Sequence, residues 1–203
     1  MSLSTFWTYL QLGFYHIADI NAYDHILFII SLCVAYIPQN WKQILTLVTA
    51  FTLGHSLTLL LASLQIIVVS SYYVELAIAI SIVLTCGYNL LYVNRLTEKM
   101  TNENIPKSPI YLHYTLALVF GCIHGLGFSG FLRAMLGKAT NIIPPLLAFN
   151  IGLEFGQMCL VMAYFTTAFV LMRYLKISHK LLLISISGSI AILASIMAIQ
   201  RIY

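Results

Sequence analysis

Charged residues are scarce in this chain, and their scarcity limits the class of protein it can be. Asp, Glu, Lys and Arg make up 8% of its 203 residues, whereas soluble domains carry about 25%. Hydrophobic residues make up 61%, and the mean hydropathy is +0.93. So few charges cannot cover a surface that faces water. The composition therefore excludes an ordinary soluble domain and predicts a polytopic membrane protein, with the lipid bilayer as its surroundings.

Organised cysteines and a basic leader are also missing. The four cysteines stand singly in apolar runs without a CxxC pair, which argues against a disulfide framework or a zinc knuckle. The first twenty residues contain no Lys or Arg, so we do not expect a cleavable signal peptide. The net charge of +4 comes from lysines and arginines in loops. It bears on orientation in a membrane, and no nucleic-acid partner is expected.

Six apolar segments are long enough to cross a bilayer, which takes about 20 residues. The predicted spans are 22–38, 43–65, 72–94, 110–132, 142–172 and 180–201. Residues 3–18 are rich in aromatics and leucine but carry no charge, which predicts an interfacial or partly inserted helix. We therefore expect an all-α fold: one membrane-embedded helical domain over 1–203, with six transmembrane helices and this additional N-terminal helix.

Lys and Arg are divided unequally between the two sets of predicted loops. The side that holds the termini carries three, which are Arg133, Lys138 and Arg201. The other side carries seven, which are Lys42, Arg95, Lys99, Lys107, Arg173, Lys176 and Lys180. Because cytoplasmic loops carry the excess of Lys and Arg, both termini are predicted to lie outside the cytoplasm.

Ionisable residues inside or at the edges of these spans are the strongest functional signal, because each costs about 2.5–3.5 kcal/mol there. At a rise of 1.5 Å per residue, His55 and His124 lie about 10 Å below the outer surface, and Glu154 about 15 Å below it. Three others lie near that surface on the same reckoning: Asp24, His25 and Glu75. Five predicted helices thus bring acids and imidazoles to the outer half of the bilayer.

Imidazole and carboxylate without organised cysteine suit nickel, cobalt, zinc or iron(II). His16 and Asp19 are three residues apart and Asn150 and Glu154 four apart, so each pair shares a helix face. The predicted metal ligands are His16, Asp19, Asp24, His25, His55, His124 and Glu154, with Thr52, Glu75 and Asn150 in supporting positions.

Taken singly, these residues have simpler explanations. A histidine in a membrane helix often only bonds to a neighbouring helix, and Glu75 or Asp24 at a helix start favours the positive end of the helix dipole. Such explanations must be invoked several times over to cover the whole set, so a metal or proton site is the favoured interpretation.

Glycines recur in the predicted span 110–132. The segment Gly125–Gly130, GLGFSG, matches the GxGxxG pattern, but it follows no strand and lies in a membrane span, which argues against a dinucleotide site. Gly121 and Gly125 instead form a GxxxG pair, which predicts close helix packing beside His124.

Four segments resemble signature segments of the HupE/UreJ family: HIADINAYDHILF, TAFTLGHSLTL, FGCIHGLGFSG and LLAFNIGLEFGQ. The resemblance covers nearly the whole chain. It implies a six- or seven-helix bundle that takes up nickel or cobalt, and we expect it in the inner (plasma) membrane of a bacterium. The family motif HPxxGxDH corresponds to His16, Asp24 and His25, with Ile17 in place of the proline and two more residues between His16 and Asp24.

The favoured function is a permease for a divalent transition metal, with nickel or cobalt as the favoured ion and zinc or iron as alternatives. The predicted inner half offers only groups such as Thr46, Thr49, Tyr88 and Asn89, which would equally suit a site that never releases its metal inward. The alternative is therefore an intramembrane, zinc-type hydrolase at the outer leaflet, with Glu154 or Asp24 as base. A metal-sensing or scaffold subunit is a third option. An enzyme is less favoured than a transporter, and no oligomeric state is predicted.

Overall fold

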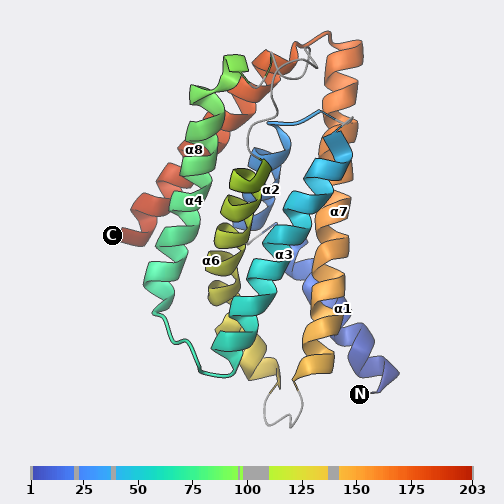
Figure 1. Cartoon of the computed structure of the whole chain (residues 1–203), viewed down its shortest axis with the longest axis vertical. Helices are drawn as coiled ribbons and strands as arrows, with labels where there is room; N and C mark the ends of the chain where they lie inside the picture. Colours follow the sequence, from blue (N-terminus) through green and yellow to red (C-terminus); the bar gives the residue numbers. More distant parts are fainter. Residues whose placement is uncertain are drawn as a thin grey trace.

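The computed structural model describes residues 2–20, 23–37, 40–95, 97, 110–136 and 142–202, and the regular elements in these ranges are all helices. The helices form one elongated bundle (Figure 1). Their bounds are α1 Leu3–Ala18, α2 Asp24–Cys33, α3 Trp41–Ser63, α4 Ser71–Leu91, α6 Ile110–Leu136, α7 Ile143–Tyr174 and α8 His179–Ile202. The all-α prediction is confirmed.

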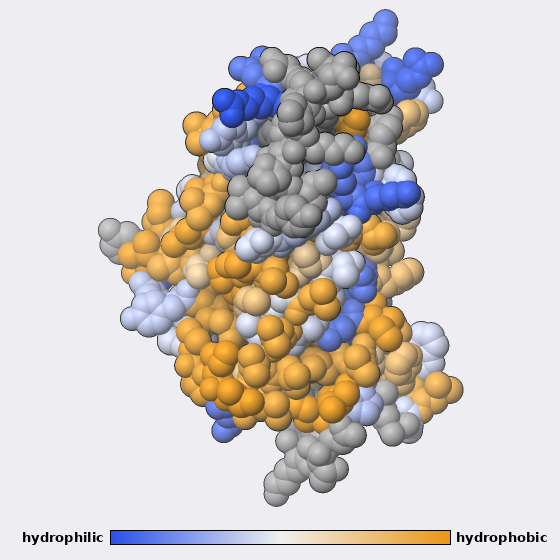
Figure 2. All heavy atoms as spheres, viewed as in Figure 1, coloured by the Kyte–Doolittle hydropathy of each residue, from blue (hydrophilic) through white to orange (hydrophobic). Residues whose placement is uncertain are grey.

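The long helices have the length and composition of membrane spans. In the part of the chain that the structure describes, five apolar segments qualify: Trp41–Ser63, Ser71–Leu91, Tyr114–Met135, Ile143–Tyr174 and His179–Ile202. Hydrophobic residues cover much of the surface, and hydrophilic residues gather toward one end (Figure 2). The chain is therefore an integral membrane protein, and five of the six predicted spans correspond closely to these helices.

The first predicted span, 22–38, does not form as expected, so a count of six spans is not confirmed. In its place lies α2, whose 10 residues extend about 15 Å, well short of a hydrocarbon core of about 30 Å. The 16 residues of α1 extend about 24 Å. Helix α1 rises from one end of the bundle, and α2 continues from there toward the other end (Figure 1). The two short helices thus form one interrupted column.

Close contact joins α1 to α7, although Trp7 and Tyr15 on α1 remain exposed. A side chain at Gly13 would collide with the carbonyl group of Phe149, and one at Gly152 with that of Leu10. Small residues allow helix backbones to approach this closely in membranes. The N-terminal helix, predicted as interfacial or partly inserted, is therefore a packed element of the bundle.

A second glycine contact joins α3 to α6. Gly121 faces the backbone of Phe51, and Gly125 faces the backbone carbonyl of His55. The predicted close approach at this GxxxG pair is confirmed. Because the contact fixes α3 against α6 beside His55 and His124, it also sets how their imidazoles lie relative to one another.

A buried polar contact fixes α2 from its other side. The side-chain amide of Asn89, on α4, donates a hydrogen bond of 2.7 Å to the backbone carbonyl of Ser31, on α2. Asn89 is 2% exposed. The same amide lies 3.4 Å from the hydroxyl of Ser187, on α8. The short helix is thus tied to two long ones.

Basic residues mark one end of the bundle, where α3 and α8 begin and α4 and α7 end (Figure 1). We call it the basic end. The exposed residues there are Lys42, Arg95, Arg173, Lys176 and Lys180. Lys99, Lys107 and Lys138, which the orientation prediction also used, lie outside the described residues. The predicted position of the termini outside the cytoplasm stays a prediction.

Candidate metal centre

The interruption between α1 and α2 brings the two ends of the opening motif together. His16 lies in the last turn of α1, and His25 lies in the first turn of α2. Irregular backbone at membrane depth is tolerated where protein surrounds it or where it lines a cavity. His25 is buried, and Nε2 of His16 is a buried atom, so both histidines reach the interior of the bundle.

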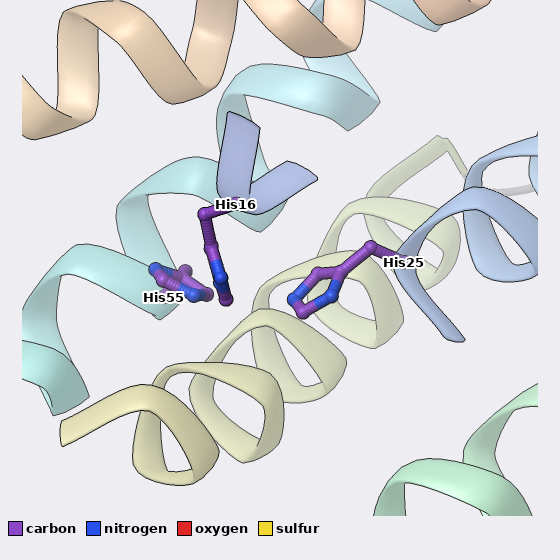
Figure 3. A group of neighbouring side chains, drawn as sticks. All are labelled: His16, His25 and His55. Atoms are coloured by element: carbon purple, nitrogen blue, oxygen red, sulfur yellow. The ribbon is translucent and has the colours of Figure 1, made fainter. Parts of the chain in front are cut away.

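Three histidines converge at this point. His16, His25 and His55 each offer a ring nitrogen, and these atoms all lie within 4.8 Å of one another. Figure 3 shows the three rings pointing toward a common centre from α1, α2 and α3. Metal–nitrogen bonds to histidine are about 2.0–2.1 Å long, so two ligands of one ion are at most about 4.2 Å apart. Small rotations of the rings would bring all three within reach of one ion.

A fourth imidazole completes the group that we call the histidine cluster: His16, His25, His55 and His124. The His124 ring, on α6, lies 4.8 Å from the His25 ring, measured between centroids. Side chains of His25, His55 and His124 are 4%, 0% and 1% exposed. Four separate helices therefore place histidines at one buried position.

Most ring nitrogens of the cluster lack a hydrogen-bond partner among the described residues. Among the described residues, buried atoms without a partner include Nε2 of His16, Nε2 of His25, and both ring nitrogens of His55 and His124. Leaving a buried polar atom unpaired costs about 1–3 kcal/mol. The recurrence of this cost in touching side chains indicates a ligand that these nitrogens bind in common, and a borderline divalent cation fits a set of imidazoles.

Asp24 orients one of these rings. Its carboxylate oxygen Oδ1 lies 2.9 Å from Nδ1 of His25 and accepts a second hydrogen bond from the His25 backbone N–H at 2.8 Å. An Nδ1–H donor leaves the lone pair on Nε2, the atom that faces the cluster without a partner. Carboxylates commonly fix metal-binding histidines in this way. Asp24 therefore acts on the site through His25.

Phenylalanines enclose the cluster. Phe128 lies 3.8 Å from His16 between ring centroids, and Phe149 stacks on Phe128 at 5.2 Å. Phe28 and Phe51 each lie 5.2 Å from His124. These rings exclude water, which strengthens electrostatic interaction with a bound cation. These phenylalanines were not predicted from the sequence. Phe28 follows His25 by three residues and Phe51 precedes His55 by four, so each shares a helix face with a cluster histidine.

Two predicted residues lie apart from the cluster. Glu75, on α4, forms an ion pair with Arg201 near the end of α8, so its position has a structural explanation. Asp19 is the residue that follows α1, at the interruption. It does not belong to the group of three whose ligand atoms come together.

The remaining predicted residues lie at the interface between α3 and α7. Glu154 accepts a hydrogen bond from the hydroxyl of Thr49, and Thr52 bonds to the side-chain amide oxygen of Gln157. Asn150 carries a buried side-chain oxygen without a partner among the described residues. Gln157 was not predicted, although its position three residues after Glu154 places both on one helix face.

Comparison with known proteins agrees with the sequence resemblance. No curated protein and no solved structure gives a significant match. The family model described as "HupE / UreJ protein" matches residues 1–201. The bundle, the buried histidines and this match over almost the whole chain lead to one assignment: the chain belongs to the HupE/UreJ family, which is associated with the uptake or insertion of nickel or cobalt.

Proposed function

We propose that the protein is a permease that carries a divalent transition metal ion, nickel or cobalt, through the membrane by way of the histidine cluster. The observation that carries the proposal is the convergence of His16, His25, His55 and His124, each of which has at least one buried ring nitrogen without a partner among the described residues. Imidazoles of this kind bind nickel, cobalt and zinc well.

The position of the cluster favours transport over permanent binding. Its ligands come from α1, α2, α3 and α6, and two of them flank the interruption between α1 and α2. Interrupted helices form the ion sites of many transporters because their half-helix ends and unwound backbone can bind ions. A movement of α2 relative to α1 would change the distance between His16 and His25 and so loosen the coordination.

Uptake into proteoliposomes tests the proposal. Vesicles that contain the wild-type protein should accumulate Ni²⁺ or Co²⁺ in a saturable manner, and the double variant His16→Ala/His25→Ala should not. His179→Ala, on α8 and outside the cluster, is the matched histidine control and should retain uptake. A metal that stays tightly bound to the wild-type protein without exchange or flux would contradict the permease and support the hydrolase.

Loss of the contact between Asp24 and His25 should weaken metal binding without abolishing it. Asp24→Asn keeps the size of the side chain but removes the charge that favours the Nδ1–H form of His25. Metal affinity should fall by about 10–100-fold, the usual cost of losing such an outer partner. Isothermal titration calorimetry with Co²⁺ measures it. Glu75→Gln removes a carboxylate outside the cluster and should leave the affinity unchanged, and equal affinities for Asp24→Asn and wild type would exclude this role for Asp24.

A further inference from the structure

Polar side chains meet a second time between α3 and α7, next to the histidine cluster. The Thr49 hydroxyl lies 2.9 Å from Oε1 of Glu154, and the Thr52 hydroxyl lies 2.7 Å from Oε1 of Gln157. Gln157 is 1% exposed and Thr52 is 6% exposed. We call these four residues the oxygen cluster, because their side chains offer hydroxyl, carboxylate and amide oxygens inside a membrane protein.

The oxygen cluster lies on the basic side of the histidines. Thr52 and Thr49 precede His55 by three and six residues on α3, which is about 4.5 and 9 Å along the helix axis. Since α3 begins at the basic end (Figure 1), both threonines lie toward that end. The two clusters therefore follow one another along the bundle.

Asn150 lies between the two clusters on α7. Its neighbour Phe149 stacks against His55, with an interplanar angle of 17°, so this turn of α7 is level with the histidines. The next turn carries Glu154, four residues later. Oδ1 of Asn150 is buried without a partner among the described residues. An unpaired oxygen at this point is a further potential cation ligand, so oxygen donors continue from the histidines to Glu154.

A cavity continues in the same direction. It is narrow and lies between α2, α3 and α7, where Gln157 is its polar lining residue from α7. At one extreme it reaches Phe28 and Phe51, which contact His124. At the other it reaches Tyr36 and Ile44, close to the basic end. The cavity is small and mainly apolar, and it touches the oxygen cluster at Gln157.

The two clusters differ in their ligand atoms, and release of the ion requires such a difference. Imidazole ligands suit nickel and cobalt, whereas carboxylate and amide oxygens suit harder ions and hold these metals less tightly. Conduction requires binding that favours entry and yet is weak enough for exit. A carboxylate inside a membrane is costly to bury, and binding a cation would offset this cost at Glu154.

We propose that the oxygen cluster of Thr49, Thr52, Glu154 and Gln157 is a second, weaker cation site, which accepts the ion from the histidine cluster and releases it toward the basic end. This proposal rests on the permease function proposed above. The second site would supply ligands between the histidines and the basic end, a region where the sequence predicts mainly hydroxyl groups.

Glu154→Gln tests the second site with two separate readouts. In detergent, calorimetry with Ni²⁺ should show a tight binding event that the variant keeps and a weaker event that it loses. In proteoliposomes, the uptake rate of the variant should fall by about tenfold or more, the size of effect seen when metal-supporting groups are lost. Thr49→Val, which removes the hydroxyl beside Glu154 at nearly constant shape, should lower uptake in the same direction.

The outcomes separate the two proposals. Glu75→Gln, the matched control on α4, should show wild-type binding and uptake. Absence of uptake by the wild-type protein would overturn the permease itself. Wild-type uptake by Glu154→Gln would overturn the second site alone and leave the permease standing. Loss of the tight binding event in Glu154→Gln, with an unchanged unfolding temperature, would place Glu154 in the histidine site and also overturn a separate second site.

Discussion

Replacing His55 with alanine is expected to abolish tight metal binding, with a loss of at least about 100-fold in affinity for Co²⁺ or Ni²⁺. Removal of an outer partner of a metal ligand already costs about 10–100-fold, and His55 offers the ligand atom itself. It is 0% exposed and lies within the group of three converging nitrogens. Calorimetry on the purified protein measures the affinity directly.

His55→Phe separates ligation from packing. The ring of His55 stacks against Phe149, and neither of its nitrogens has a hydrogen-bond partner among the residues that the structure describes. A phenylalanine retains the stacked ring and removes two unpaired polar atoms, so the metal-free variant should unfold at the wild-type temperature or above it.

The wild-type protein and His55→Phe should differ in how much added metal stabilises them. At a concentration 100 times the dissociation constant, it should stabilise the wild-type protein by about 2.7 kcal/mol and leave His55→Phe unchanged. A thermal unfolding assay with and without metal reports both results. Metal-dependent stabilisation of His55→Phe equal to that of the wild type would show that His55 is not a ligand.

The histidine cluster could be anticipated because burial of ionisable groups is costly and therefore informative. Few such groups occur in the apolar segments, and the structure brings His16, His25, His55 and His124 together. The chemistry of the candidate site was thus accessible from residue type and approximate depth, without knowledge of helix contacts.

Contacts between helices were not accessible in this way. Distance along the predicted span placed Glu154 at a depth similar to that of the histidines. Its hydrogen bond to Thr49 depends on which helix faces meet, and that is known only from the structure. Glu75 pairs with Arg201, which lies 126 residues later in the chain. Neither pairing leaves a local pattern in the sequence.

The shortness of α2 and the packing of α1 against α7 were missed for a related reason. The apolar run after Asp24 continues past the end of α2 at Cys33, so composition alone suggests a longer helix. Residues 3–18 lack charge, which fits an interfacial helix as well as a packed one. The glycine contact of Gly13 with α7 depends on tertiary packing, and it is this packing that carries His16 into the interior.

Gly125→Ala is expected to have a large effect on stability, because the position has no room for a methyl group. A Cβ atom at Gly125 would collide with the backbone carbonyl of His55 and with the hydroxyl of Thr58. Backbone cannot rotate away as a side chain can, so α3 and α6 must separate. We expect a loss of about 3 kcal/mol, at the upper end for overpacked positions, measured as the free energy of unfolding in mild detergent.

The same substitution should also weaken metal binding, since the displaced carbonyl belongs to His55 itself. Gly130→Ala is the matched control: it lies on the same helix, and among the described residues no atom outside its own stretch of helix lies within 4 Å of an added Cβ. It should retain both stability and affinity. If Gly125→Ala were as stable as Gly130→Ala, α3 and α6 could not pack as closely as described. If it lost stability but kept full affinity, the histidine cluster would not depend on the contact between α3 and α6, and other contacts would have to set the geometry of the site.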